Sequence, residues 1–416
     1  MNKSWHQDDR LHFAVGIEDT FVPQGAEGER PIDEYELTEH YENLEPDLAL
    51  AKDVGASLVR WGIPWYRVQP DPNQWDFDWV DRAMDAFAEL SLEPIVDLLH
   101  YGTPLWMDNQ FDSSDYPKRV AEYSAKVAER YAHLGVNSYT PVNEPMIHAL
   151  FCGEYSYWPP YLSGTAGLSR MVRQLAEGFV RAQQAIKDVL ASNAVMVHVD
   201  AGMRFIGDDK APEHRELASR LRHQVHLVED LVVGYVDESH PLMPFLRDHG
   251  WTDEDFAYFE HEPQFPDVMG INYYPRHSTE VLEAGKNPMG GFTDPRPVQN
   301  AGIAGLDELI RHAAKRYRAP VMVSETCVTG TVAERIEWLE ESVAWAHAIR
   351  NEGIDLVAYT WWPLFDMYEW TWRHSTAERE AHRLTMGLWE LAESPHGLLR
   401  KETAVAQVYR RLASIS

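Results

Sequence analysis

Thr140-Pro141-Val142-Asn143-Glu144-Pro145 places an asparagine and a glutamate where a β-like run passes into a loop. A second carboxylate, Glu325, lies at the end of the apolar run 321–326, much later in the chain. A single carboxylate at a strand end is weak evidence of function. Two carboxylates that lie this far apart in the sequence can meet only in a closed or layered fold. The fold therefore decides whether Glu144 and Glu325 form one site.

Apolar runs rich in β-branched residues alternate with longer amphipathic stretches, which is the pattern of repeated βα units. The predicted strands are 12–17, 57–63, 94–100, 138–142, 194–200, 267–274, 320–324 and 356–362. The predicted helices are 46–54, 79–90, 118–133, 168–190, 332–350 and 402–412, and 275–300 is expected to be a long loop. This order predicts a single (β/α)8 TIM-barrel domain over residues 1–416, with its active site at the carboxyl ends of the strands. An open doubly wound sheet is less favoured, because no Gly-x-Gly-x-x-Gly turn follows the first strand.

The composition limits the possible partners. The chain has 66 Asp and Glu against 37 Lys and Arg, a net charge of −29, which argues against nucleic acid and anionic membrane surfaces. Cys152 and Cys327 are too few for a disulfide framework or a cysteine zinc site. The N-terminus lacks the apolar core of a signal peptide, and no run of about 18 apolar residues is present. We therefore expect a soluble cytoplasmic protein, whose oligomeric state the sequence leaves open.

Polar residues at the predicted strand ends can converge on one mouth of the barrel. They are Arg60, His100, Asn143, Glu144, Asn272, Tyr274, Glu325 and Glu369. Tryptophans occur near the same loops, namely Trp106, Trp158, Trp361, Trp362, Trp370 and Trp372, although any single one is more often a packing residue. Sugar rings have apolar faces and hydroxyl edges, so a polar site walled by tryptophan indicates a carbohydrate ligand.

Arg60 lies inside an apolar strand and needs a carboxylate partner, because an unpaired buried charge is very costly. Glu325 is a candidate, and the pairing would keep it ionised and nucleophilic. Glu144 would need a raised pKa in order to donate a proton. His198 and Asp200 are two metal-type ligands in one strand without a third nearby, so we expect neither a catalytic metal nor another cofactor.

A series of motifs, in the same order along the chain, resembles glycoside hydrolase family 1, a family of retaining β-glucosidases and β-galactosidases. In the first half of the chain, LVRWGIPWYR (58–67) resembles the family's R-F-S-I-S-W-x-R, LHYGTPLW (99–106) resembles its H-W-D-x-P-x-W, and TPVNEP (140–145) resembles its T-x-N-E-P. Further along, GINYY (270–274) resembles the family's G-x-N-Y-Y, and VSET (323–326) lies where the family has T-E-N-G. Near the C-terminus, WPLFDMYEW (362–370) resembles W-S-L-x-D-N-F-E-W, and MGL (386–388) and Lys401 lie where the family has F-G-L and a late lysine. Any one of these motifs is modest evidence, but seven motifs in the order of the family are strong evidence.

The resemblance implies that Glu144 is the general acid/base and Glu325 the nucleophile of a double displacement. Retention would require the two carboxyls to lie about 5–5.5 Å apart. The resemblance also implies supporting roles for other residues: a donor to the sugar 2-hydroxyl (Asn143), holders of the nucleophile (Arg60 and Tyr274), and the floor and hydroxyl-reading wall of the pocket (His100, Trp362, Glu369 and Trp370).

Several departures from the family pattern surround the expected pocket. The family's Q-I-E-G stretch, whose Gln reads two sugar hydroxyls, is GIEDTF at 16–21, where Glu18 or the displaced Gln24 is the candidate replacement. Tyr101-Gly102 replaces W-D, Thr326-Cys327 replaces N-G, and Met367 replaces an Asn. These changes leave the preferred sugar and aglycone open.

The leading hypothesis is a retaining β-glycosidase that acts on a β-glucoside or β-galactoside. The Glu369 carboxylate would repel a phosphate, which favours a non-phosphorylated sugar. A transglycosidase on the same scaffold and a catalytically silent sugar-binding barrel are the alternatives. The presence of both Glu144 and Glu325 argues against the silent barrel.

Overall fold

The computed structural model describes residues 4–23, 25–207, 211–282 and 298–415. Within them, eight parallel strands close into a barrel whose spatial order is the order of the sequence. They are β1 (His12–Gly16), β4 (Leu58–Gly62), β5 (Glu93–Asp97), β6 (Ser138–Thr140), β7 (Val195–Ala201), β9 (Val268–Asn272), β11 (Val321–Thr326) and β12 (Leu356–Trp361). β1 pairs with both β4 and β12 and so closes the ring. The predicted (β/α)8 barrel is confirmed, and every predicted strand lies in it.

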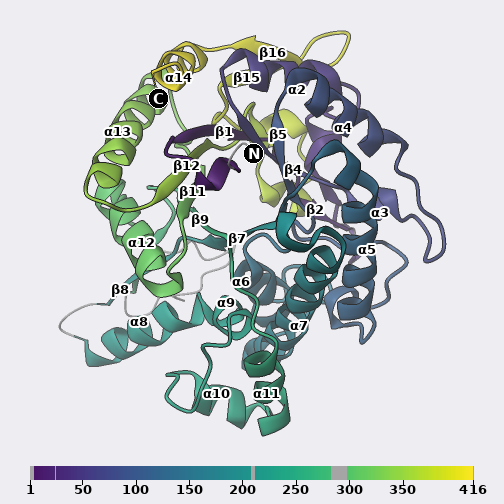
Figure 1. Ribbon diagram of the computed structural model, residues 1–416, viewed down its shortest axis with the longest axis vertical. Coiled ribbons are helices and arrows are strands. Elements are labelled where there is room, and N and C mark those ends of the chain that lie inside the picture. The colour runs from purple at the N-terminus through teal and green to yellow at the C-terminus, as the bar shows by residue number, and fades with distance from the viewer. Residues whose placement is uncertain (1–3, 24, 208–210, 283–297, 416) are drawn as a thin grey trace.

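Helices form a layer around the barrel (Figure 1). They are α2 (Leu44–Asp53), α4 (Asp78–Leu90), α5 (Tyr116–Tyr131), α7 (Gly164–Leu190), α12 (Gly302–Tyr317), α13 (Val332–Asn351) and α14 (Ala404–Ala413). The sequence predicted all of these but α12. α13 begins with a capping box in which Thr331 and Glu334 satisfy each other's backbone N–H groups. In the described ranges, no helix combines the length and apolarity that a membrane span requires.

Between β7 and β9 the chain adds helices that the strand and helix patterns did not predict. They are α8 (Pro212–Gln224), α9 (Leu227–Val232), α10 (Met243–Asp248) and α11 (Asp253–His261). In Figure 1, α10 and α11 lie at the bottom of the view and α8 lies at the lower left. The predicted loop 275–300 is wrong in part, because β10 (Thr279–Leu282) pairs with β8 (Arg204–Gly207). Residues 283–297 of that prediction lie outside the described residues.

Shorter elements lie in the connections that lead from a barrel strand to the next helix around the barrel. They are α1 (Glu34–Leu37), α3 (Trp65–Val68), α6 (Pro145–His148), β2 (Phe21–Val22), β3 (Ile32–Asp33), β13 (Met367–Tyr368), β14 (Arg383–Leu384), β15 (Trp389–Ala392) and β16 (Leu399–Glu402). The last six pair into small antiparallel sheets: β2 with β3, β13 with β14, and β15 with β16.

Successive side chains of each barrel strand point alternately into the barrel interior and toward the surrounding helices. A small buried cluster fills the interior: Trp5, Ala14, Leu58, Ile95, Val195, Val197, Val199, Val268, Met322, Val357 and Ala358. Val59 and Trp61 of β4 instead join the large cluster beneath the helices. Because side chains of a strand alternate between two faces, Arg60 points the same way as Leu58, into the barrel. The register therefore directs a charged group toward the barrel axis near the carboxyl ends of the strands.

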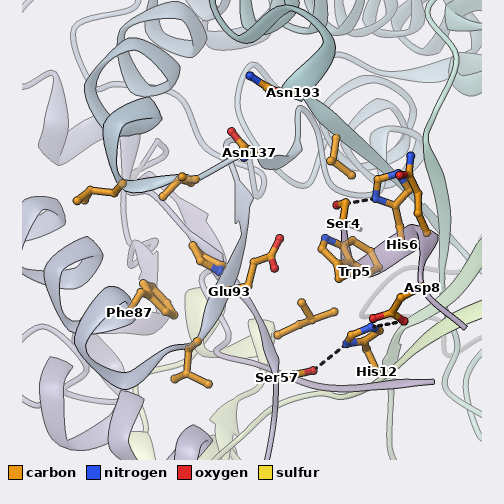
Figure 2. A pocket seen from close by; sticks show the side chains of 18 of the residues that line it. Ser4, Trp5, His6, Asp8, His12, Ser57, Phe87, Glu93, Asn137 and Asn193 are labelled. Carbon is orange, nitrogen blue, oxygen red and sulfur yellow. Dashed lines mark hydrogen bonds and ion pairs between the residues drawn. The ribbon is translucent and has the colours of Figure 1, made fainter. Parts of the chain in front are cut away.

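The amino-terminal end of the barrel is closed by the short helix η1 (Trp5–Gln7), where the Trp5 indole donates a hydrogen bond to Ser138 Oγ at 2.9 Å. A polar cavity of about 690 Å³ lies at this end, beside His12 and Glu93 (Figure 2). In barrels of this kind the amino-terminal face contributes to stability, whereas the chemistry takes place at the opposite face.

Candidate active site

Different local backbone features place Glu144 and Glu325 at the carboxyl end of the barrel. Glu144 follows β6 in a left-handed backbone conformation (φ 44°), and its N–H donates to Val199 O at 3.0 Å. β11 carries one residue more than β9 and β12 next to Glu325. Without this bulge Glu325 would share the direction of Val323, which packs beneath the helices. The bulge instead turns the carboxylate into the barrel, as bulges beside active sites often do.

Arg60 is fully buried and joins three strand ends. Its Nη1 donates to Glu325 Oε1 at 2.7 Å, and its Nη2 donates to Asp97 Oδ2 at 2.7 Å and to Asn143 Oδ1 at 3.0 Å. The structure thus pairs Arg60 with two carboxylates, which supply the counter-charge that a buried guanidinium needs.

Each of the two glutamates has its own further donors. Tyr274 donates its hydroxyl to Glu325 Oε2 at 2.6 Å. Asn272 donates to Glu144 Oε1 at 2.9 Å, and the Tyr101 hydroxyl donates to Glu144 Oε2. Glu325 therefore accepts from a cation and a phenol, whereas Glu144 accepts from two uncharged groups.

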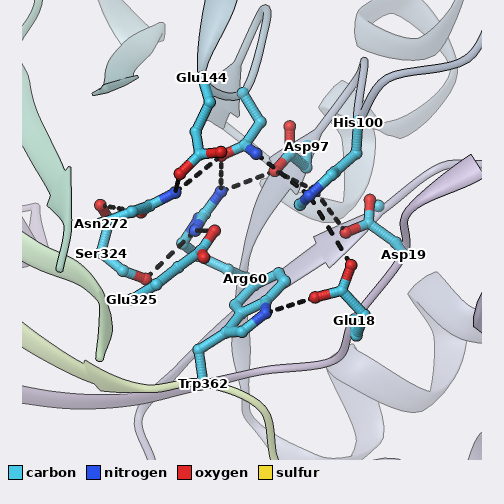
Figure 3. Close-up of polar contacts among 12 residues, drawn as sticks. Glu18, Asp19, Arg60, Asp97, His100, Glu144, Asn272, Ser324, Glu325 and Trp362 are labelled. Atoms are coloured by element: carbon cyan, nitrogen blue, oxygen red, sulfur yellow. Dashed lines mark hydrogen bonds and ion pairs between the residues drawn. The ribbon is translucent and has the colours of Figure 1, made fainter. Parts of the chain in front are cut away.

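Glu18, Asp19, His100 and Trp362 form the polar floor of the site. The Trp362 indole donates to Glu18 Oε2 at 2.7 Å, and His100 Nδ1 lies 2.8 Å from Asp19 Oδ1. Close packing depends on glycine here, because a Cβ on Gly16 would lie 1.7 Å from the Trp362 ring. Figure 3 shows Glu144 and Glu325 on one side of Arg60, and Glu18 and Asp19 on the other.

A cavity of about 300 Å³ opens over this network. Its lining is Glu18, His100, Tyr101, Glu144, Tyr274, His277, Glu325, Thr329, Met367, Glu369, Trp370, Leu384 and Met386. The structure thus brings most of the predicted site residues to one cavity. Asn143 and Trp362 are fully buried behind the lining, and the Asn143 amide nitrogen lies 3.1 Å from His100 Nε2. A contact of Asn143 with a sugar hydroxyl stays a prediction.

Burial raises the pKa values of both glutamates. For Glu325 burial outweighs the opposing effect of Arg60, and with the added charge of Glu144 the pKa rises to about 8. Burial also raises the pKa of Glu144, against the hydrogen bonds from Tyr101 and Asn272. Arg60 lowers the pKa of Glu325, as the sequence led us to expect, but burial has the larger effect and the net shift is upward. Two neighbouring carboxyls with raised pKa values share protons as a pair.

His100 is the second cation of the site. Burial opposes its charge, but Asp19 and then Asp97 and Glu18 raise its pKa well above the usual value. Asp19, Asp97 and His100 form the one group of metal-type ligands in the described residues whose ligand atoms lie within 4.8 Å of one another. Since His100 already faces Asp19, and Asp97 binds Arg60 at 2.7 Å, these charges are matched internally. The group fits a buried imidazolium better than a metal site.

Sequence reasoning missed Asp97 and the contact that Tyr101 makes. Asp97 was visible as an ionisable residue inside an apolar strand, the same signal that singled out Arg60. Tyr101 was noted only as a departure from a motif, and its left-handed backbone (φ 79°), which a sequence does not reveal, accompanies the contact with Glu144.

The chain resembles known proteins along most of its length. The sequence model of glycosyl hydrolase family 1 matches residues 14–377. A bifunctional β-D-glucosidase/β-D-fucosidase of Bifidobacterium breve is 25% identical over 383 residues, covering 80% of this chain and 81% of the relative. β-Glucosidase A of Thermotoga maritima is 22% identical over 357 residues, covering 80% and 79%. The structure of the family 1 β-glucosidase from Thermotoga maritima in complex with isofagomine lactam superposes with a TM-score of 0.76 at 18% identity, covering 91% of this chain and 87% of that one. This chain is therefore a glycoside hydrolase that acts on O-glycosyl bonds, and it belongs to glycosyl hydrolase family 1.

Proposed function

We propose that residues 1–416 form one catalytic domain that hydrolyses a non-phosphorylated β-glucoside or β-galactoside with retention of configuration. The observation that carries this proposal is the different treatment of two carboxyls in one cavity. Glu325 is held by Arg60 at 2.7 Å and Tyr274 at 2.6 Å, whereas Glu144 is held by the neutral Asn272 and Tyr101.

The shared proton resides on Glu144 in the active form. Burial raises the pKa of both carboxyls, which favours the retention of a proton by the pair. The guanidinium of Arg60 stabilises a negative charge on Glu325 more strongly than an amide stabilises one on Glu144, since charge-assisted hydrogen bonds are the stronger kind. Glu325 is then the nucleophile and Glu144 the acid.

In the first step, Glu325 attacks the anomeric carbon and the bond to the leaving oxygen breaks. Glu144 gives its proton to that oxygen, which leaves a covalent glycosyl–enzyme ester and an ionised Glu144. In the second step, Glu144 takes a proton from water while the water oxygen attacks the anomeric carbon. The ester breaks, the sugar leaves with its original configuration, and both carboxyls return to their starting forms.

A panel of aryl β-glycosides tests the proposal, with the configuration of the first-formed sugar read by NMR. We expect a β-glucoside or a β-galactoside to turn over and to release the β-anomer first. Release of the α-anomer would refute the double displacement, and the absence of turnover across the panel would refute the proposed substrate class.

We expect Tyr101→Phe to shift the alkaline limb of the kcat/KM profile upward by about one pH unit. The Tyr101 hydroxyl favours the ionised form of Glu144, so its loss raises the Glu144 pKa further. Glu144 must carry its proton to act, and activity therefore persists to higher pH. An alkyl glycoside is the substrate of choice, because its leaving group needs the proton. The matched control is Tyr274→Phe, which removes a donor to Glu325 and should move the acidic limb instead. An unchanged or lowered alkaline limb in Tyr101→Phe contradicts the assignment.

We expect a sugar 6-phosphate to be cleaved at least about 100-fold less efficiently than the plain glucoside, since placing like charges together costs several kcal/mol. Glu369 lines the cavity, and its Oε2 accepts a hydrogen bond from Thr371 at 2.6 Å. Replacing it as Glu369→Gln removes the repulsion and should reduce the difference to about tenfold. The measurement is kcat/KM for the two p-nitrophenyl substrates. Equal efficiency in the parent enzyme would contradict the prediction.

A further inference from the structure

Glu18 brings a carboxylate to the cavity floor, and its hydrogen-bond donors are uncharged. The Thr20 N–H donates to Glu18 Oε1 at 3.1 Å, the Thr20 hydroxyl donates to the same oxygen, and the Trp362 indole donates to Oε2 at 2.7 Å. Glu18 is 4% exposed and lines the cavity. A carboxylate held in this way accepts hydrogen bonds and donates none.

The cations near Glu18 lie closer to other carboxylates than to Glu18. His100 Nε2 lies 3.9 Å from Glu18 Oε1, beyond hydrogen-bond distance, while His100 Nδ1 lies 2.8 Å from Asp19. Arg60 binds Glu325 and Asp97. The floor therefore carries more negative than positive charge: Glu18, Asp19, Asp97 and the pair formed by Glu144 and Glu325 stand against Arg60 and His100.

The Glu18 carboxylate has capacity for one more donor. A carboxylate offers about four lone-pair positions, and Thr20 and Trp362 fill three of them. A sugar hydroxyl supplies a hydrogen bond in the fourth position but no charge. An ammonium group supplies both, and such charge-assisted hydrogen bonds are roughly twice as strong as neutral ones.

The position of Glu18 decides which part of the sugar it meets. The anomeric carbon must lie next to Glu144 and Glu325, where the bond is broken. Glu18 lies across Arg60 and Trp362 from these two residues (Figure 3). In a pyranose ring C4 is the atom most distant from the anomeric carbon, and C3 and C5 lie next to it. Of these atoms, C3 and C4 carry hydroxyls directly on the ring, so their substituents face Glu18.

We propose that Glu18 makes this site selective for β-glycosides whose sugar carries a protonated amino group on C3 or C4, an inference that rests on the proposed glycosidase function. The amino group donates to the free position of Glu18 and neutralises its charge. The hydrogen bond that the same carboxylate accepts from a hydroxyl of a neutral sugar is weaker, so neutral glycosides are the poorer substrates.

The test compares p-nitrophenyl β-D-glucoside with its 3-amino-3-deoxy and 4-amino-4-deoxy analogues, by kcat/KM at a pH where the amines are protonated. We expect at least one amino analogue to be preferred about tenfold over the glucoside, the gain typical of replacing a neutral hydrogen bond with a charged one. Glu18→Gln should remove this preference, and Glu18→Asp, which retains the charge, should keep part of it.

Asp19→Asn is a second test of the same argument. It removes the carboxylate that lies 2.8 Å from His100 Nδ1 and leaves His100 to pair with Glu18, whose Oε1 lies 3.9 Å from Nε2. The preference for the amino sugar should therefore fall in this variant, and an unchanged preference would contradict the argument from charge. Circular dichroism and thermal unfolding of each variant show whether it is folded.

Calorimetric binding of 3-amino-3-deoxyglucose, 4-amino-4-deoxyglucose and glucose separates this inference from the glycosidase function. If glycosides are cleaved but the parent enzyme shows no preference for either amine, the inference is overturned and the glycosidase function stands. If no glycoside is cleaved while an amino sugar binds in a Glu18-dependent manner, the selectivity stands and the glycosidase function fails. A preference that persists in Glu18→Gln overturns the role of Glu18.

Discussion

Replacing Glu325 by glycine is expected to lower kcat for an aryl β-glycoside by about 10⁵-fold, because loss of the nucleophile abolishes the covalent step. Glu325 is the carboxylate held by Arg60 and Tyr274, and the bulge in β11 directs it into the cavity. The variant also leaves a space beside the anomeric carbon. Added azide should enter this space and attack the anomeric carbon in place of the carboxylate, which yields the α-glycosyl azide in a single displacement.

Glu144→Ala is the matched partner of this experiment. It keeps the nucleophile and removes the acid/base, so a substrate with a good leaving group still forms the glycosyl–enzyme, which then turns over slowly. Azide takes the place of the activated water and yields the β-glycosyl azide. The two variants should thus give azides of opposite configuration, measured by NMR. The same anomer from both, or parent-like activity in Glu325→Gly, would refute the assigned roles.

Replacing Arg60 by methionine should destabilise the fold by about 3–5 kcal/mol and abolish activity, because it leaves carboxylates buried without their counter-charge. Arg60 is fully buried and lies 2.7 Å from both Asp97 and Glu325. We expect a clear fall in the midpoint of thermal unfolding, followed by circular dichroism. Catalysis fails as well, since the nucleophile loses the cation that favours its ionised form.

The double variant Arg60→Met with Asp97→Leu provides the control for stability. The second substitution removes one of the two carboxylates that lost their cation. It should restore a large part of the decrease in the midpoint of thermal unfolding, because a buried apolar pair often replaces a buried ion pair at little cost. Activity should not return, since Glu325 still lacks its partner. If Arg60→Met unfolds at the same temperature as the parent, the ion pairs contribute nothing and the prediction is wrong.

The barrel was predictable because its strands are buried on both faces. A parallel strand between helices and a barrel interior reads as a continuous apolar run, and each run recurred after an amphipathic stretch. α12 and the helices from α8 to α11 were missed, although α12 has an ordinary buried face that includes Leu306 and Ile310. β10 was missed because its partner β8 is distant in sequence, and strand pairing of that kind leaves no local signal.

The sequence by itself determined the order of the βα units, the two catalytic glutamates as candidates, and Arg60 as a charge in need of a carboxylate. These follow from periodicity, from motif order and from the cost of a buried charge. Only the tertiary structure decided what surrounds them: Asp97 as the second partner of Arg60, the Tyr101 hydroxyl on Glu144, and Glu18 at the floor of the cavity. These contacts depend on a bulge, on left-handed residues and on the closure of the barrel. The contacts join residues from separate strands, so they cannot be predicted from a local pattern of residue types.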